Sequence, residues 1–272
     1  MTVALIDSGL GLLATAGRLR HLAPELDLLL LLDPEGAPWG PKSTSFITDR
    51  LVSAAHDAVE RGAEALVVPC NTATVTAIEA LRQEFEPRVP VIGTVPAVKP
   101  AAAAAPGIAV WATVRTTASD YQTRLIADFA QHKPVVRVAC PGLAEGIDRG
   151  DPAAVTASIA DAAGRTPGHC AAVVLGCTHY ALVAAEILRH LPAGTTLYDS
   201  AEAVARQTLR RLGRTTEPHG AAGRVDVVLS GRPGSLPAAA RSYAVGRALA
   251  AATHVPREAL LPDPFLPERE HA

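Results

Sequence analysis

Short, continuous apolar runs alternate along the chain with longer segments in which apolar residues recur at helical spacing. The apolar runs predict strands at residues 3–6, 27–32, 65–68, 89–93, 108–112, 135–140, 171–175, 195–198 and 225–230. The helical segments lie at residues 45–61, 73–84, 119–131, 152–163, 181–190, 201–212 and 236–251. Strand–helix alternation of this kind predicts an α/β fold with mainly parallel sheets that helices cover on both faces.

An internal repeat indicates that the chain contains two copies of one structural unit. The segment 65–70 aligns with 172–177, each an apolar run that ends in a cysteine. At the same offset, three positions of the following helices also match: Glu79, Leu81 and Arg82 fall on Glu186, Leu188 and Arg189. The loops at 93–94 and 199–200 correspond as well. We therefore expect two similar lobes, related by a pseudo-twofold axis, with a ligand site in the cleft between them.

Composition and charge narrow the class of protein. The chain has 272 residues, of which 49% are hydrophobic and 19% charged, as in a globular protein. No apolar run reaches the roughly 18 residues that span a bilayer, and no cleavable leader opens the chain, so we expect a cytoplasmic protein without a membrane partner. The formal net charge of −2 gives no basic surface for nucleic acid.

The cysteines are the main candidates for chemistry. Four of them, Cys70, Cys140, Cys170 and Cys177, are too few and too widely spaced for a disulfide framework or a paired metal site. Cys140 and Cys170 are interpreted as small core residues. Cys70 and Cys177 occupy equivalent positions where a strand ends, followed by polar residues, and a helix N-terminus there is expected to lower a thiol pKa from about 8.5 toward neutrality.

Two matched thiols, one from each half, favour one reaction class. Inverting a stereocentre at an acidic carbon needs a base on one face and an acid on the other, and the roles exchange in the reverse direction. Pyridoxal phosphate would need a lysine, and only Lys42, Lys99 and Lys133 are present, none in a phosphate-binding context. We therefore expect a racemase that needs neither cofactor nor metal.

Several further segments carry a family resemblance. They are residues 7–11 (DSGLG), 38–43 (PWGPKS), 70–73 (CNTA), 176–180 (GCTHY) and 199–201 (DSA), with weaker ones at 112–116 and 139–141. In order and spacing they resemble the motifs of glutamate racemases in the aspartate/glutamate racemase family, over roughly residues 3–247. The resemblance implies interconversion of L- and D-glutamate, with D-glutamate supplied to peptidoglycan synthesis, and leaves a homodimer open.

The resemblance also implies residue roles. Cys70 would exchange the α-proton with the D-enantiomer and Cys177 with the L-enantiomer. Asp7 would assist Cys70, and His179 with Asp148 would assist Cys177. The amino-acid pocket would be lined by Asp7, Ser8, Trp39, Gly40, Asn71, Thr72, Thr116, Thr178 and His179.

It further implies the lobe limits. The first lobe would comprise residues 1–94 and about 207–255, because the chain would return to it, and the second lobe residues 95–206. Residues 256–272, rich in proline and charge, are expected to form a mobile tail.

Departures from the family pattern keep alternatives open. Trp39 replaces the usual tyrosine, Leu12 a glycine, Arg115 a small residue, and Asp148 a glutamate. The alternatives are a related racemase acting on aspartate or a hydantoin, and a non-catalytic amino-acid-binding or regulatory protein.

Single residues have simpler interpretations too. Asp7 could cap the helix that follows Gly11, His179 could be a surface histidine, Asp148 a loop charge, and Trp39 a packing residue.

Overall fold

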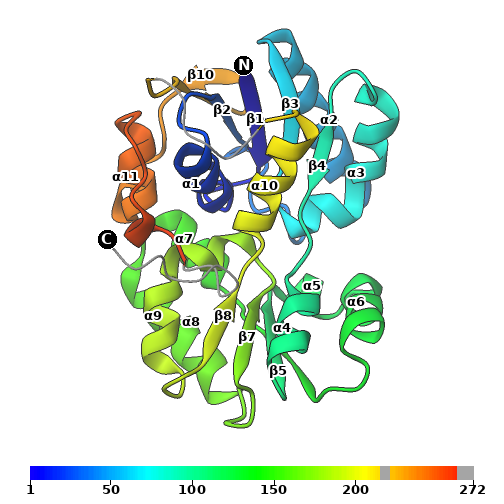
Figure 1. Cartoon of the computed structure of the whole chain (residues 1–272), viewed down its shortest axis with the longest axis vertical. Helices are drawn as coiled ribbons and strands as arrows, with labels where there is room; N and C mark the ends of the chain where they lie inside the picture. Colours follow the sequence, from blue (N-terminus) through cyan, green and yellow to red (C-terminus); the bar gives the residue numbers. More distant parts are fainter. Residues whose placement is uncertain (215–220, 262–272) are drawn as a thin grey trace.

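The computed structural model describes residues 1–214 and 221–261, which form two α/β lobes (Figure 1). The sheet of the first lobe has the strand order β10-β9-β2-β1-β3-β4. Its strands are β1 (Thr2–Asp7), β2 (Asp27–Leu32), β3 (Ala63–Val68), β4 (Val91–Gly93), β9 (Val225–Leu229) and β10 (Arg232–Gly234). All neighbours in this sheet are parallel except β10, which pairs antiparallel with β9.

The sheet of the second lobe repeats the central part of the first. It contains β5 (Ile108–Ala112), β6 (Val135–Ala139), β7 (Ala172–Leu175) and β8 (Thr196–Tyr198), all parallel, in the order β6-β5-β7-β8. The strands β2-β1-β3-β4 have the same order in the first lobe. The prediction of two similar α/β lobes is therefore confirmed, and Cys70 and Cys177 each follow the third strand of their lobe.

Helices cover both faces of the first sheet because its strands are apolar on both sides. Alternate residues of β1 enter different cores: Val3 and Leu5 one, Ala4 and Ile6 the other. The first core includes α1 (Leu12–Leu22), α10 (Ala201–Arg211) and α11 (Ala244–Ala250); the second includes α2 (Thr44–Glu60) and α3 (Asn71–Phe85). Helix α10 spans the expected lobe limit at 206–207 and packs against α1.

The second sheet is covered in the same way. One face carries α4 (Val98–Ala104) and α6 (Asp120–Ala130), and the other α7 (Leu143–Arg149), α8 (Pro152–Gly164), the 3-10 helix η1 (Thr178–Val183) and α9 (Ala184–His190). The short helix α5 (Val114–Thr117) directly follows β5. The repeat extends to the helices, because Arg82–Glu79 and Arg189–Glu186 form equivalent ion pairs.

Several elements differ from the predicted ones. Helices α4, α5 and α7 and strand β10 were not expected. The single helix predicted at 236–251 is instead the 3-10 helix η2 (Ala238–Ser242) followed by α11. At the start of the expected tail, η3 (Arg257–Ala259) is followed by Leu260, which is buried in the first core. Ala259 and Leu260 thus pack against the first lobe and Leu261 against a core of the second lobe. Residues 262–272 lie outside the described residues.

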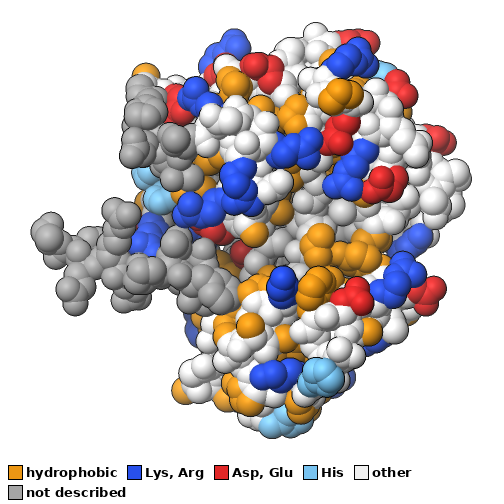
Figure 2. Space-filling view, turned by 45° about the vertical axis from the view of Figure 1, so that its right-hand side comes forward, with side chains coloured by type: hydrophobic (Ala, Val, Ile, Leu, Met, Phe, Trp, Pro, Cys, Tyr) orange, Lys and Arg blue, Asp and Glu red, His pale blue; other side chains and the backbone are white. Residues whose placement is uncertain are grey.

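The chain passes between the lobes after β4, at 94–97, and after β8, at 199–200. These crossings include Thr94 and Ser200, from the loops 93–94 and 199–200 that the repeat had matched. The hydroxyl oxygens of Thr94 and Ser200 lie 2.7 Å apart there. Beside these connections is a cavity of about 500 Å³, and Figure 2 shows apolar side chains gathered at the waist between the lobes. Within the described residues, no helix is long and apolar enough to cross a membrane.

Candidate active site

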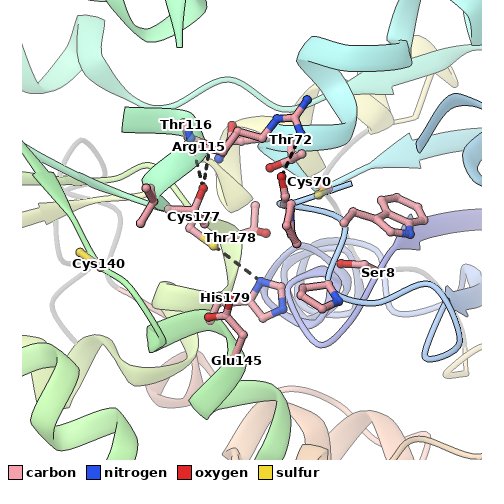
Figure 3. A pocket seen from close by; sticks show the side chains of 18 of the residues that line it. Ser8, Cys70, Thr72, Arg115, Thr116, Cys140, Glu145, Cys177, Thr178 and His179 are labelled. Carbon is pink, nitrogen blue, oxygen red and sulfur yellow. Dashed lines mark hydrogen bonds between the residues drawn. The ribbon is translucent and has the colours of Figure 1, made fainter. Parts of the chain in front are cut away.

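A cavity of about 430 Å³ opens between the lobes at the carboxyl ends of β1, β3, β5 and β7 (Figure 3). In each sheet the first and third strands are neighbours, and the chain turns to opposite sides after them. Such a switch point is where open parallel sheets bind ligands. The cavity therefore receives residues from the switch points of both lobes.

The thiols of Cys70 and Cys177 enter this cavity from different lobes (Figure 3). Each cysteine precedes a helix with nearly the same extended backbone, φ −141° and ψ 114° at Cys70, and φ −134° and ψ 130° at Cys177. Each is only 8% exposed. The structure thus brings together the two thiols that the sequence repeat had paired.

Asp7 lies behind Cys70, fully buried at the end of β1 and outside the cavity lining. Its Oδ1 accepts a hydrogen bond of 2.7 Å from the Ser8 N–H, while its Oδ2 has no partner among the described residues. Burial raises the pKa of Asp7 to about 6, although the nearby charge of His179 opposes the rise.

The pKa of Cys70 lies well above its ordinary value, first because the thiol is buried and second because the Asp7 charge is close. The expectation of a lowered thiol pKa at this helix N-terminus is therefore wrong for Cys70. Desolvation and a like charge outweigh the helix dipole here.

Cys177 is part of a thiol–imidazole–carboxylate chain. Its Sγ lies 3.7 Å from His179 Nδ1, and His179 Nε2 lies 3.1 and 3.2 Å from the two carboxylate oxygens of Asp148. Burial alone would lower the pKa of His179, but the charge and hydrogen bond of Asp148 outweigh it, so that pKa is well above its usual value. A base oriented by a third group is a common way to activate a nucleophile or acid.

The partly buried carboxyl of Asp148 also accepts a hydrogen bond of 2.7 Å from the Leu10 N–H, through the same Oδ1 that lies 3.1 Å from His179. Burial would raise its pKa, but His179 and this N–H hold it below its usual value. Leu10 belongs to the first lobe and Asp148 to the second, so the contact also links the lobes.

Two glycines leave room for these groups. A Cβ atom on Gly9 would overlap the Asp148 carboxylate. One on Gly11 would overlap the carboxylate of Asp7, the hydroxyl of Thr178 and Nδ1 of His179. The loop 7–11 therefore needs glycine at both positions because the acid/base groups pack directly against its backbone.

Of the residues predicted to line the amino-acid pocket, all except Asp7 line this cavity. They are Ser8, Trp39, Gly40, Asn71, Thr72, Thr116, Thr178 and His179. Asn71 additionally donates from Nδ2 to the carbonyl of Gly176, at 2.9 Å. Because Asn71 follows Cys70 and Gly176 precedes Cys177, this hydrogen bond connects the backbone at the two thiols.

A comparison with protein-family profiles matches residues 20–208 to the family described as Asp/Glu/hydantoin racemase. This chain belongs to that family. Among its curated relatives, the glutamate racemase of Pseudomonas syringae pv. tomato is 39% identical over 220 residues, covering 78% of this chain and 79% of the relative.

Solved structures of the family have the same fold. A crystal structure of Escherichia coli glutamate racemase, with L-glutamate and the activator UDP-MurNAc-ala, matches with a TM-score of 0.77 at 30% identity and covers 93% of this chain and 96% of that one. A glutamate racemase isoform from Bacillus anthracis matches with a TM-score of 0.69 at 26% identity, covering 84% and 88%.

The structure tests several of the simpler interpretations of site residues. Asp7 does not cap the helix after Gly11, because α1 has no side-chain cap. His179 is 6% exposed and so is not a surface residue. Trp39 is both a packing residue and part of the cavity wall, since it is 1% exposed and its Nε1 donates to Asp33 at 2.9 Å.

Some cavity residues were not predicted as site residues. Thr113, Arg115, Glu145 and Cys140 line the wall contributed by the second lobe. Glu145 lies one helical turn before Asp148 on α7, so the spacing would have indicated it had this helix been recognised. Within the described residues, no group of three or more His, Cys, Asp or Glu side chains is arranged to hold a metal ion.

Proposed function

We propose that this racemase-family chain interconverts L- and D-glutamate by two-base proton transfer and supplies D-glutamate for peptidoglycan synthesis. The observation that carries the proposal is the pair of strand-end thiols that enter one cavity from different lobes. The glutamate racemase activity of the curated relatives, and L-glutamate in the related Escherichia coli structure, support glutamate as the substrate. Formation of a homodimer stays a prediction.

In the direction from L to D, Cys177 takes the α-proton from one face and Cys70 gives a proton to the other. His179, oriented by Asp148, exchanges a proton or hydrogen bond with Cys177 across 3.7 Å. Cys70 begins as a neutral thiol because burial and the Asp7 charge raise its pKa. Once Cys70 has given up its proton, the same two effects favour its return.

The backbone around each thiol suits the anionic intermediate of this reaction. Asn71 and Thr72 follow Cys70, and Thr178 and His179 follow Cys177. N–H groups at two helix starts would therefore lie beside a carbon held between the thiols. Such groups favour carboxylate and the negative charge that builds up when the α-proton leaves.

Proton exchange in deuterated water tests this mechanism. Starting from L-glutamate, deuterium should enter the D-product early, while recovered L-glutamate stays largely unlabelled. Cys70→Ser and Cys177→Ser should each abolish racemisation in both directions, because a serine hydroxyl is far too weak an acid to replace a thiol.

Cys170→Ser is the matched control, since Cys170 is buried outside the cavity lining. Substantial racemisation by either variant of the proposed pair would refute the two-base mechanism.

A further inference from the structure

Four charged side chains line the cavity: Arg115, Glu145, Asp148 and His179. Asp148 and His179 bind each other and so largely neutralise one another. Arg115 and Glu145 form no ion pair with any described residue. The cavity therefore presents one uncompensated cation and one uncompensated anion to a ligand.

The Arg115 guanidinium is held at the junction of the two lobes. It extends from α5 in the second lobe and donates through Nη1 to the carbonyl of Gly40, at 3.0 Å, and to that of Lys42. Its Nε and Nη2 groups have no partner among the described residues. Arg115 is an exposed residue, but these two carbonyls position its guanidinium, and a guanidinium with free N–H groups is suited to a carboxylate.

The uncompensated charges lie at different ends of the site. Figure 3 shows Arg115 beside Thr72. Glu145 lies next to His179, at the end of the site that is opposite Arg115. An anionic group of a bound molecule is thus attracted toward the Arg115 end and repelled from the Glu145 end.

We propose that Arg115 binds the distal carboxylate of the substrate and that Glu145 keeps this carboxylate out of the opposite end. This inference rests on the proposed glutamate racemase function and extends it to substrate recognition. Glutamate has a second carboxylate beyond the reacting carbon, and Arg115 is the one unpaired cation among the lining residues that the structure describes. The carbonyls of Gly40 and Lys42 fix the guanidinium in position.

The first experiment replaces Arg115 with Gln, which keeps an N–H donor for the Gly40 carbonyl but removes the charge, and with Lys, which keeps the charge. Steady-state kinetics are measured with L-glutamate and with its neutral isostere L-glutamine. Arg115→Gln should lower kcat/KM for glutamate about 10- to 100-fold, mainly through KM, and remove the preference over glutamine. Arg115→Lys should keep part of that preference, and Arg124→Gln, on the exposed side of α6, is the matched control.

If Arg115→Gln keeps the preference for glutamate, or if it lowers kcat with KM unchanged, Arg115 holds the loop at Gly40 rather than the substrate, and the proposal is refuted. Calorimetric binding of both amino acids gives a readout that does not depend on turnover. A wild-type chain that binds glutamate through Arg115 without racemising it refutes the proposed function alone. A chain that binds neither amino acid refutes both.

The second experiment replaces Glu145 with Gln. If Glu145 prevents reversed binding, the variant should bind glutamate in a second, unproductive orientation. Unproductive binding lowers kcat and KM by the same factor and leaves kcat/KM unchanged. Unaltered kcat and KM in Glu145→Gln would refute the role of Glu145.

Discussion

Replacing Asp7 with Asn should make the protein more stable and less active at neutral pH. The Asp7 carboxyl is fully buried, and its pKa rises from 3.8 to about 6 on folding. At about 1.4 kcal/mol for each pH unit of pKa difference, ionising this group costs the folded state about 3 kcal/mol at pH 8. Such a cost is typical of acid/base groups held in an apolar site for function.

The sign of the pH dependence follows from the direction of the pKa change. The pKa of Asp7 is raised in the folded state, so this state binds more protons than the unfolded chain, and the group's stabilising contribution is lost as pH rises through about 6. Asn cannot ionise. The stability of Asp7→Asn relative to wild type should therefore grow by about 1.4 kcal/mol between pH 5 and pH 8.

Urea denaturation followed by circular dichroism at several pH values measures this difference. Asn keeps an oxygen for the Ser8 N–H, and any constant effect of its amide does not change with pH. Asp128→Asn, on the exposed side of α6, is the matched control and should show no such trend. If the free energies of unfolding of wild type and Asp7→Asn changed in parallel with pH, the reasoning would be refuted.

Three further expectations concern the site. Gly11→Ala should lower kcat at least 10-fold and stability by about 1–3 kcal/mol, because its Cβ would displace the acid/base groups; Gly164→Ala, whose Cβ meets nothing within 4 Å, should not. His179→Asn should slow turnover about 10²- to 10⁴-fold, mainly from L-glutamate, and equal losses in both directions would contradict its assignment to one thiol. Cys140 and Cys170 both lie in a core of the second lobe, although Cys140 also lines the cavity. Cys140→Ala and Cys170→Ala should leave turnover within a few-fold and cost about 1 kcal/mol in chemical denaturation, and a folded but inactive variant would contradict a packing role for that residue.

Interior strands of both sheets could be predicted from sequence because strands buried on both faces are continuous apolar runs. Strand β2 has the predicted limits 27–32, and β5 the predicted limits 108–112. Helix α7 could not be found in this way. It has seven residues between Gly142 and Gly150, both in the left-handed region with φ 76° and 62°, and is too short to show a helical period.

The residues of the site could be named from sequence, but their electrostatics could not. The sequence placed Cys70 at a helix start, and the helix dipole alone would lower its pKa. The pKa of Cys70 is raised instead, because the fold buries this thiol and brings Asp7 from another strand beside it. The placement of Arg115 against Gly40 depends likewise on how the lobes face each other, which local pattern does not encode.

The hydrogen bond from Asn71 to Gly176 has a consequence for how this fold tolerates change. It joins the neighbour of one thiol to the neighbour of the other, so the acid-to-base separation is set within a few bonds of the reaction. Because this contact is local, we expect substitutions in distant helices to disturb the spacing of the thiols less than a substitution of Asn71 would. We therefore expect the outer surfaces of the lobes to tolerate substitution better than the backbone at 70–71 and 176–177 does.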